Sequence, residues 1–211
     1  MGWIDYIIQN QEEFWHLVRQ HLMITGTVSM LAICIGVPLG IYITRNKKLE
    51  GPVINLANIG QTIPTFAVFG LVLPFMGIGL KPAIFALFIY GILPIIRNTY
   101  TGIKTVDPAL TEAALGMGMT SSQILFRVEI RLALPIIMAG IRTSVVIGVG
   151  TAALASFIAA GGLGDLITRG LSMMDNDTLL AGAIPTAIIA VLADTILGRV
   201  EKALVPRGIQ R

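Results

Sequence analysis

Charged residues are scarce in this sequence. Only 13% of its 211 residues are Asp, Glu, Lys or Arg, whereas 55% are hydrophobic and the mean hydropathy is +0.81. In a water-soluble domain roughly 25% of residues are charged, so the composition argues against one. A net charge of +3 is also too small to indicate a nucleic-acid partner, and we expect none. The sequence therefore predicts a chain whose main solvent is the lipid bilayer.

Residues that build catalytic or metal centres are also scarce. Cys34 is the single cysteine, which excludes an internal disulfide and a metal site made of several cysteines. The two histidines, His16 and His21, lie before and at the start of the first long apolar run. The glycine-rich stretch 161–164 lacks the Lys-Ser/Thr of a phosphate-binding loop, and no nucleophile-base pair is recognisable. We predict that the chain is not an enzyme and carries no metal or cofactor of its own.

Long apolar runs are abundant. A helix needs roughly 20 apolar residues to cross the hydrocarbon core of a bilayer. Five runs satisfy this criterion approximately, at 21–44, 53–74, 82–101, 134–158 and 179–197. The sequence therefore predicts an all-α integral membrane protein with about five transmembrane helices, forming one domain over residues 21–198.

Basic residues indicate how the chain is oriented. They gather after the first run, between the third and fourth runs, and in the tail 199–211, as Arg45, Lys47, Lys48, Lys104, Arg127, Arg131, Arg199, Lys202, Arg207 and Arg211. Lys and Arg are enriched in cytoplasmic loops. We therefore predict that the N-terminus lies outside and the C-terminus inside.

The segment 1–20 has amphipathic character. Trp3, Ile7, Phe14 and Leu17 fall near one helical face, with charged residues elsewhere. This pattern predicts a helix lying on the outer membrane surface. The alternative is a frayed tail whose aromatic side chains sit at the level of the lipid headgroups.

The predicted cytoplasmic loop, residues 104–133, is too long for a simple connection. Asp107 followed by Pro108 is typical of a helix start, because the carboxylate caps free N–H groups and proline is tolerated in the first turn. The helix should end near Met117, with Gly118 in the left-handed conformation. The loop therefore begins with a short helix.

A second helix should follow. Thr120 and Gln123 have the spacing of a capping box, in which each side chain accepts a hydrogen bond from the other's backbone N–H. We expect this helix to end at Leu134, because Pro135 restricts the residue before it and marks a turn into the fourth span. The loop is thus predicted to be two helices joined at a glycine.

The loop carries a family resemblance. Glu112, Ala113 and Ala114, followed after three residues by Gly118, resemble the EAA loop of permease subunits in binding-protein-dependent ABC importers. The resemblance implies a coupling helix that sits in a groove of a cytoplasmic ATPase. The sequence departs from the family pattern at Arg131, where a proline is expected. The alternative is an ordinary loop helix packed on its own bundle.

Other stretches resemble one branch of that family, the importers of quaternary-ammonium osmoprotectants such as glycine betaine, carnitine and choline. These stretches are Gln61-Thr62-Ile63-Pro64, Asn98-Thr99, Asp107-Pro108 and Gly161-Gly162-Leu163-Gly164. Methionine-type importers share the EAA and GGLG features, so an importer of methionine or another amino acid is the alternative. The branch assignment depends mainly on the QTIP stretch.

The resemblance also implies a fold, partners and a location. It implies the fold of type I importers and a multi-pass protein of a prokaryotic inner or plasma membrane. The implied partners are an ATPase dimer that holds ATP and Mg, a second permease, identical or homologous, and an extracytoplasmic solute-binding protein. Gly161, Gly162 and Gly164 would belong to the outer gate and the dock of the binding protein.

Polar residues inside the predicted spans are candidates for the translocation path. They are Gln61, Thr62, Pro64 and Thr65 in the second span and Ser144 and Thr151 in the fourth. Such groups either line a path or form hydrogen bonds between helices, and the sequence does not distinguish these roles.

Ionisable residues well inside the runs are limited to Arg142 and Asp194, which we expect to reach toward the cytoplasmic face or to pair. A proton- or sodium-driven secondary transporter usually has carboxylates at mid-membrane depth, so their scarcity argues against that function. A membrane scaffold without transport activity is the other alternative.

Overall fold

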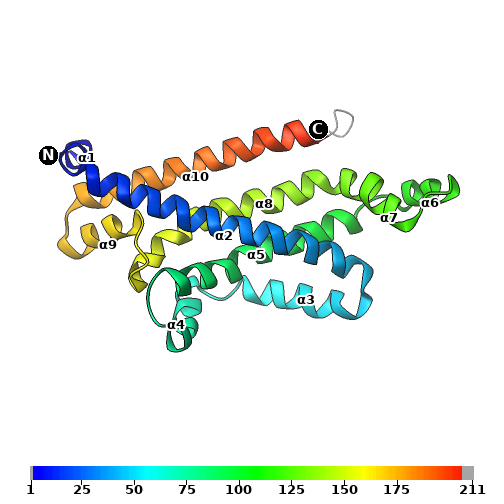
Figure 1. Cartoon of the computed structure of the whole chain (residues 1–211), viewed down its shortest axis with the longest axis horizontal. Coiled ribbons are helices and arrows are strands. Elements are labelled where there is room, and N and C mark those ends of the chain that lie inside the picture. The colour runs from blue at the N-terminus through cyan, green and yellow to red at the C-terminus, as the bar shows by residue number, and fades with distance from the viewer. Residues whose placement is uncertain (1, 206–211) are drawn as a thin grey trace.

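The computed structural model describes residues 2–205, and every regular element in that part of the chain is a helix. Four of them run along the long axis of an elongated bundle (Figure 1): α2 (Gln11–Arg45), α5 (Leu80–Lys104), α8 (Ile130–Ala152) and α10 (Asn176–Leu204). Each is long and apolar enough to cross a membrane. The predicted all-α membrane architecture is confirmed.

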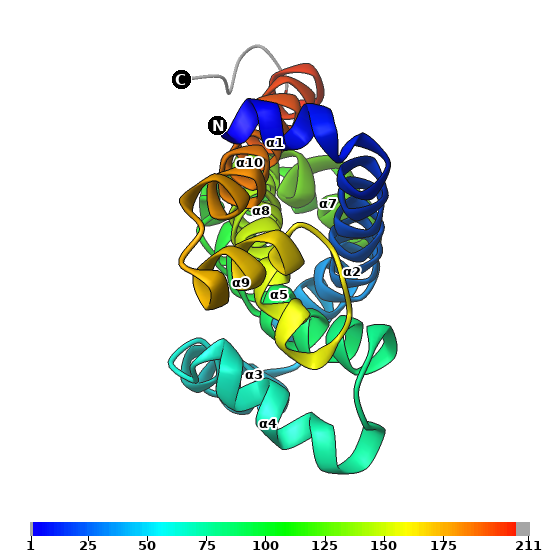
Figure 2. The ribbon, with the colours of Figure 1, turned by 90° about the vertical axis from the view of Figure 1, so that its left-hand side faces the viewer.

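The second predicted span is broken in two. The stretch 53–74 falls within α3 (Lys47–Gly60) and α4 (Thr65–Met76), whose axes differ by 103°. The break lies at Thr62–Pro64, where Pro64 lacks a backbone N–H and has the extended ψ of 138°. In the end-on view α3 and α4 lie to one side of the bundle, below α5 (Figure 2).

The bent pair still crosses the bundle. At the start of α3, Glu50 accepts hydrogen bonds from Tyr100 and Lys104, which lie at the end of α5. The start of α5 lies at the opposite end, where the Gly79 N–H donates to the Ile158 carbonyl at 2.7 Å. Because α3 and α4 begin beside one end of α5 and lead into the other, we interpret them as a fifth crossing.

The fourth span differs from the prediction at its start. The chain does not turn at Pro135. One continuous helical stretch is made of α7 (Ser121–Ile124), a π-helical turn η1 (Leu125–Glu129) and α8, and Pro135 lies inside α8. The predicted end of the second loop helix at Leu134 is therefore wrong. Membrane helices tolerate an internal proline, since neighbouring groups satisfy the freed carbonyl. The span then ends in a 3-10 helix, η2 (Ala153–Ile158).

The N-terminal segment packs on its own chain. α1 (Trp3–Gln9) is separate, whereas residues 11–20 are continuous with the first span in α2. Phe14 and Leu17 are buried with Leu163, Leu166 and Ala181, and Trp3 and Ile7 pack against this cluster. The partner elements are α9 (Gly164–Met173) and α10. The apolar face of the N-terminal segment thus packs against the rest of the chain. Neither interpretation of the sequence included this packing.

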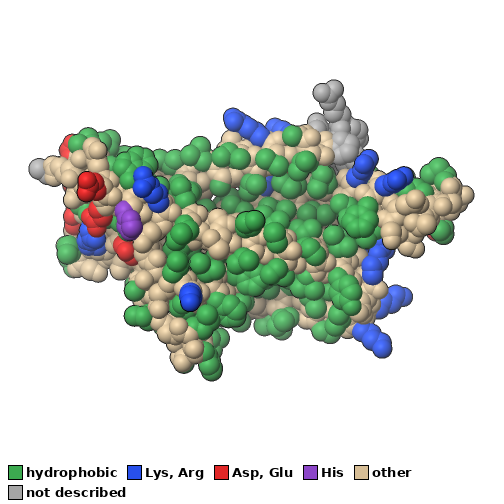
Figure 3. Space-filling model, viewed as in Figure 1, with side chains coloured by type: hydrophobic (Ala, Val, Ile, Leu, Met, Phe, Trp, Pro, Cys, Tyr) green, Lys and Arg blue, Asp and Glu red, His purple; other side chains and the backbone are tan. Residues whose placement is uncertain are grey.

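Charge divides the molecule into two ends. Lys and Arg side chains gather at the end that carries α6 (Pro108–Gly116), acidic side chains near the end that carries α9, and hydrophobic side chains between them (Figure 3). We call these the α6 end and the α9 end. Arg207 and Arg211 of the predicted tail lie outside the described residues.

Candidate coupling and translocation sites

The helix α6 begins and ends as its sequence predicts. The Asp107 side chain accepts a hydrogen bond from the Ala109 N–H at 2.9 Å, and Pro108 occupies the first turn. After the cap residue Met117, Gly118 has a φ of +82°, the left-handed conformation that glycine adopts without strain. The chain therefore turns sharply between α6 and α7.

The capping box is also confirmed. The Thr120 N–H donates to the Gln123 side chain at 2.8 Å, and the Gln123 N–H donates to the Thr120 hydroxyl at 3.3 Å. These bonds satisfy donors that have no partner within the first turn of a helix. The start of α7 is thus fixed next to the glycine elbow.

The loop helix α6 extends beyond the bundle and exposes apolar side chains (Figure 1). Leu110 is 47% exposed, Leu115 63% and Met117 76%, whereas Ala114 is buried against the chain's own loop. Glu112 and Ala113 are exposed as well. So short a helix is not stable alone in water, and an uncovered apolar surface of this kind is typical of an interaction site.

An ion pair holds the loop against the bundle. Glu129, in the π-helical turn after α7, is buried and accepts a hydrogen bond from Arg45 at the end of α2. π-helical turns are rare and occur frequently at functional sites. Sequence reasoning missed this pair, because the two residues are 84 positions apart.

The QTIP stretch occupies the bend between α3 and α4. Gln61 and Thr65 are partly buried, whereas Thr62 and Pro64 are exposed. The Thr62 hydroxyl donates to the Ile59 carbonyl at 2.7 Å, within its own turn. All four residues of the stretch and its edge, Gln61, Thr62, Pro64 and Thr65, thus lie together at the break between α3 and α4. Their role in a path stays a prediction.

The glycine-rich stretch lies at the α9 end. Gly161 and Gly162 have φ values of +80° and +89°, and the Gly162 N–H donates to the Gln20 side chain at 3.1 Å. Gly164 packs so closely on η2 that an added Cβ would stand 2.7 Å from the Ala153 carbonyl carbon. These glycines join α9 to α2 at Gln20 and to the start of η2. Their role as gate and dock stays a prediction.

Comparison with known proteins identifies the family. Residues 36–207 match the model of the binding-protein-dependent transport system inner membrane component. The chain belongs to this family. It is a permease, a multi-pass transport subunit rather than an enzyme.

Individual relatives agree with the assignment. The permease is 48% identical over 208 residues to the carnitine transport permease protein OpuCD of Listeria monocytogenes, covering 96% of this chain and 92% of the relative. It is 45% identical over 207 residues to the glycine betaine/carnitine/choline transport system permease protein OpuCB of Bacillus subtilis, covering 98% and 95%. A chain of the inward-facing MetNI methionine ABC transporter has the same fold, with a TM-score of 0.85 at 23% identity, covering 94% and 99%.

Ser144 and Thr151 of the permease have different surroundings. The Ser144 hydroxyl is buried and donates to the Gly91 carbonyl at 2.5 Å, which joins α8 to α5. The Thr151 hydroxyl donates to Ile147, in its own helix, at 2.9 Å, and its side chain is only partly buried. The structure favours the interhelical role for Ser144 and leaves Thr151 as a candidate for the path.

We expect the two residues to respond oppositely to substitution. Ser144→Ala should lower the stability of the purified permease by about 0.6 kcal/mol, the average for an interhelical hydrogen bond in a membrane, and leave uptake unchanged. Thr151→Val should leave the stability unchanged and reduce uptake. Thermal unfolding in detergent and uptake into vesicles measure the two effects, and equal responses at both positions would contradict the distinction.

The α9 end of the permease has its own polar network. Arg169 on α9 donates to the Glu13 carboxylate at 2.6 Å and to the Tyr6 hydroxyl at 3.4 Å. The hydrogen bonds with Glu13 raise the pKa of the Arg169 guanidinium, which stays charged. Burial raises the pKa of the Asp165 carboxyl, and the charge of Arg169 opposes that effect. This network fastens the N-terminal segment to α9.

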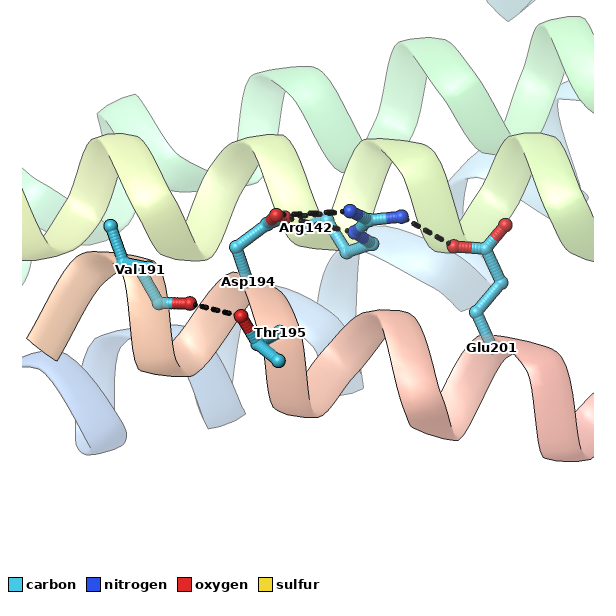
Figure 4. A network of polar contacts seen from close by, with 5 residues as sticks. All are labelled: Arg142, Val191, Asp194, Thr195 and Glu201. Atoms are coloured by element: carbon cyan, nitrogen blue, oxygen red, sulfur yellow. Dashed lines mark hydrogen bonds and ion pairs between the residues drawn. The ribbon is translucent and has the colours of Figure 1, made fainter.

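Arg142 and Asp194 pair, which is one of the two outcomes that the sequence predicted. The Arg142 guanidinium donates to both Asp194 oxygens, at 2.9 and 3.0 Å, and to Glu201 at 2.8 Å (Figure 4). Glu201 was missed, because the sequence placed it in the cytoplasmic tail. Within residues 2–205 no cluster of side chains could hold a metal ion.

Proposed function

We propose that this permease carries small quaternary-ammonium solutes through the membrane as the transmembrane subunit of an ATP-driven importer. The transport class comes from the family, and the solutes named for its relatives, carnitine, glycine betaine and choline, supply the substrate class. The single observation that supports ATP coupling is α6, an exposed, partly apolar helix at one end of the bundle.

The partners follow from the two ends. The α6 end, rich in Lys and Arg, is the cytoplasmic end by the positive-inside rule and receives an ATPase dimer that binds ATP and Mg. The α9 end faces the outside of a prokaryotic plasma membrane and receives the solute-binding protein near Gly161, Gly162 and Gly164. A second permease, identical or homologous, completes the path.

Coupling would proceed through a rigid connection. The apolar side chains of Leu115 and Met117 would be buried in the groove of an ATPase, and this burial would attach α6 to that subunit. The elbow at Gly118 passes a displacement into α7, and α7 continues through the π-helical turn into α8 without a break. Closure of the two ATPases would then tilt α8 and open the path to the outside, and hydrolysis would reset it.

Reconstitution tests the function. Proteoliposomes with the permease, its ATPase and its binding protein should take up choline, carnitine or glycine betaine only with ATP, and methionine should not be transported. Glu112→Lys should reduce both co-purification of the ATPase and uptake, because it reverses a charge on the exposed face of α6. Preferred uptake of methionine would contradict the substrate class, and uptake without ATP would contradict the coupling.

A further inference from the structure

The strongest feature that the proposed function does not use is the charged trio Arg142, Asp194 and Glu201. Arg142 lies in α8 and Asp194 in α10, inside the predicted fourth and fifth spans. The Arg142 side chain is nevertheless 33% exposed and that of Asp194 44%. Charges within membrane-spanning segments almost always face a water-filled cavity or the interior of an assembly.

The trio has a surplus of negative charge. One guanidinium faces two carboxylates, with Asp194 held by two hydrogen bonds and Glu201 by one (Figure 4). Arg142 lies over Gly198, which separates the two carboxylate residues on α10, and an added Cβ there would stand 3.5 Å from the guanidinium carbon. The formal charges sum to one negative charge, which a cation of single charge would balance.

A hollow adjoins the trio. It has a volume of about 370 Å³ and is lined by Arg142, Asp194, Ala139, Thr143, Val146 and Ile147. Apart from the ion pair and one hydroxyl, the lining consists of methyl and methylene groups. A quaternary ammonium group has no N–H to donate and presents only methyl and methylene groups around a positive charge. It therefore needs a carboxylate at long range and apolar contacts at short range. The hollow offers Asp194 and apolar groups in its lining, and Glu201 adjoins it through the bond to Arg142.

The hollow also lacks features of a tight site. No aromatic side chain is among its lining residues, so the cation–π attraction that strengthens the binding of such cations is missing there. Weak binding suits a site through which a solute passes, because conduction requires that a solute can leave as well as enter.

We propose that the hollow beside Arg142 and Asp194 is a transient site for the cationic group of the solute, and that the surplus carboxylate of the adjoining trio favours a net cation over a zwitterion. The inference rests on the proposed function. Choline carries a net positive charge, whereas glycine betaine and carnitine also carry a carboxylate. The negative trio would attract choline more strongly, since the carboxylate of a zwitterion is repelled.

The test is the ratio of choline uptake to glycine betaine uptake in the same proteoliposomes. Glu201→Gln removes the surplus charge and leaves both bonds between Arg142 and Asp194 intact. We expect the ratio to fall about tenfold, as the loss of one unit charge about 12 Å from the solute at an effective dielectric constant near 20 implies. The binding protein is unchanged, so its own preference cancels when the variant is compared with wild type.

A control and a second variant complete the experiment. Thr195→Val is the control, because the Thr195 hydroxyl bonds Val191 of its own helix and makes no bond to Arg142 (Figure 4). The ratio should stay at the wild-type value. If Glu201→Gln does not assemble, Asp194→Asn removes the same unit of charge and keeps an oxygen for Arg142.

The outcomes separate the two proposals. An unchanged ratio with retained uptake would overturn the site. An equal loss of both solutes together with a lower melting temperature would also overturn it, since the trio would then only fasten α8 to α10. If the wild type takes up no quaternary-ammonium solute at all, the proposed function itself fails.

Discussion

Replacement of Gly118 by valine should reduce ATP-driven uptake by about tenfold or more while the permease still inserts in the membrane. Gly118 has a φ of +82°, and a non-glycine residue in the left-handed conformation costs about 1–2 kcal/mol, with β-branched residues the least tolerated. Because every 1.4 kcal/mol is a factor of ten in an equilibrium constant, the elbow would change its conformation. The helix α6 would then point away from the groove that it fits.

Gly116 supplies the matched control. It lies two residues earlier in the same loop, has an ordinary φ, and an added Cβ there would meet nothing within 4 Å. Gly116→Val should therefore retain most of the uptake. The measurements are ATP-dependent uptake and the amount of ATPase that co-purifies with each variant. Equal losses of uptake in both variants would show that uptake depends on the surface of the loop and not on the left-handed turn at Gly118.

Replacement of Gly164 by alanine should have the largest effect on stability. The added Cβ would overlap the Ala153 carbonyl oxygen and stand 2.7 Å from the carbonyl carbon. Backbone atoms cannot rotate away as a side chain can, so α9 and η2 would have to separate. Overpacking typically costs 1–3 kcal/mol, and we expect about 3 kcal/mol or more here. For a chain of this length that corresponds to roughly 6–12 °C in melting temperature.

Gly70 is the control for this prediction. It lies on the exposed side of α4, and an added Cβ there would meet nothing within 4 Å. Gly70→Ala should keep or slightly raise the melting temperature, because alanine is the better helix former. Thermal unfolding of both variants in one detergent provides the measurement. A Gly164→Ala permease that melts with the wild type would contradict the close packing between α9 and η2.

Local signals in the sequence were reliable where they act over a few residues. The Asp107 cap, the turn at Gly118 and the capping box at Thr120 all form as predicted, because each depends on backbone groups within one turn of a helix. Pro135 gave a wrong prediction for the opposite reason. A proline interrupts one hydrogen bond of a helix, and packing in a membrane bundle maintains the helix on both sides.

By itself, the sequence determined the solvent, the number of apolar runs, the two-helix loop and the family, because composition, hydropathy and capping are properties of neighbouring residues. Only the tertiary structure decided which distant residues meet. The pairs Arg45–Glu129, Ser144–Gly91 and Arg142–Glu201 join positions separated by 84, 53 and 59 residues, and no periodicity in a single sequence relates them. Their placement follows from how the helices cross, because a buried or membrane-embedded polar group must find its partner across a helix interface.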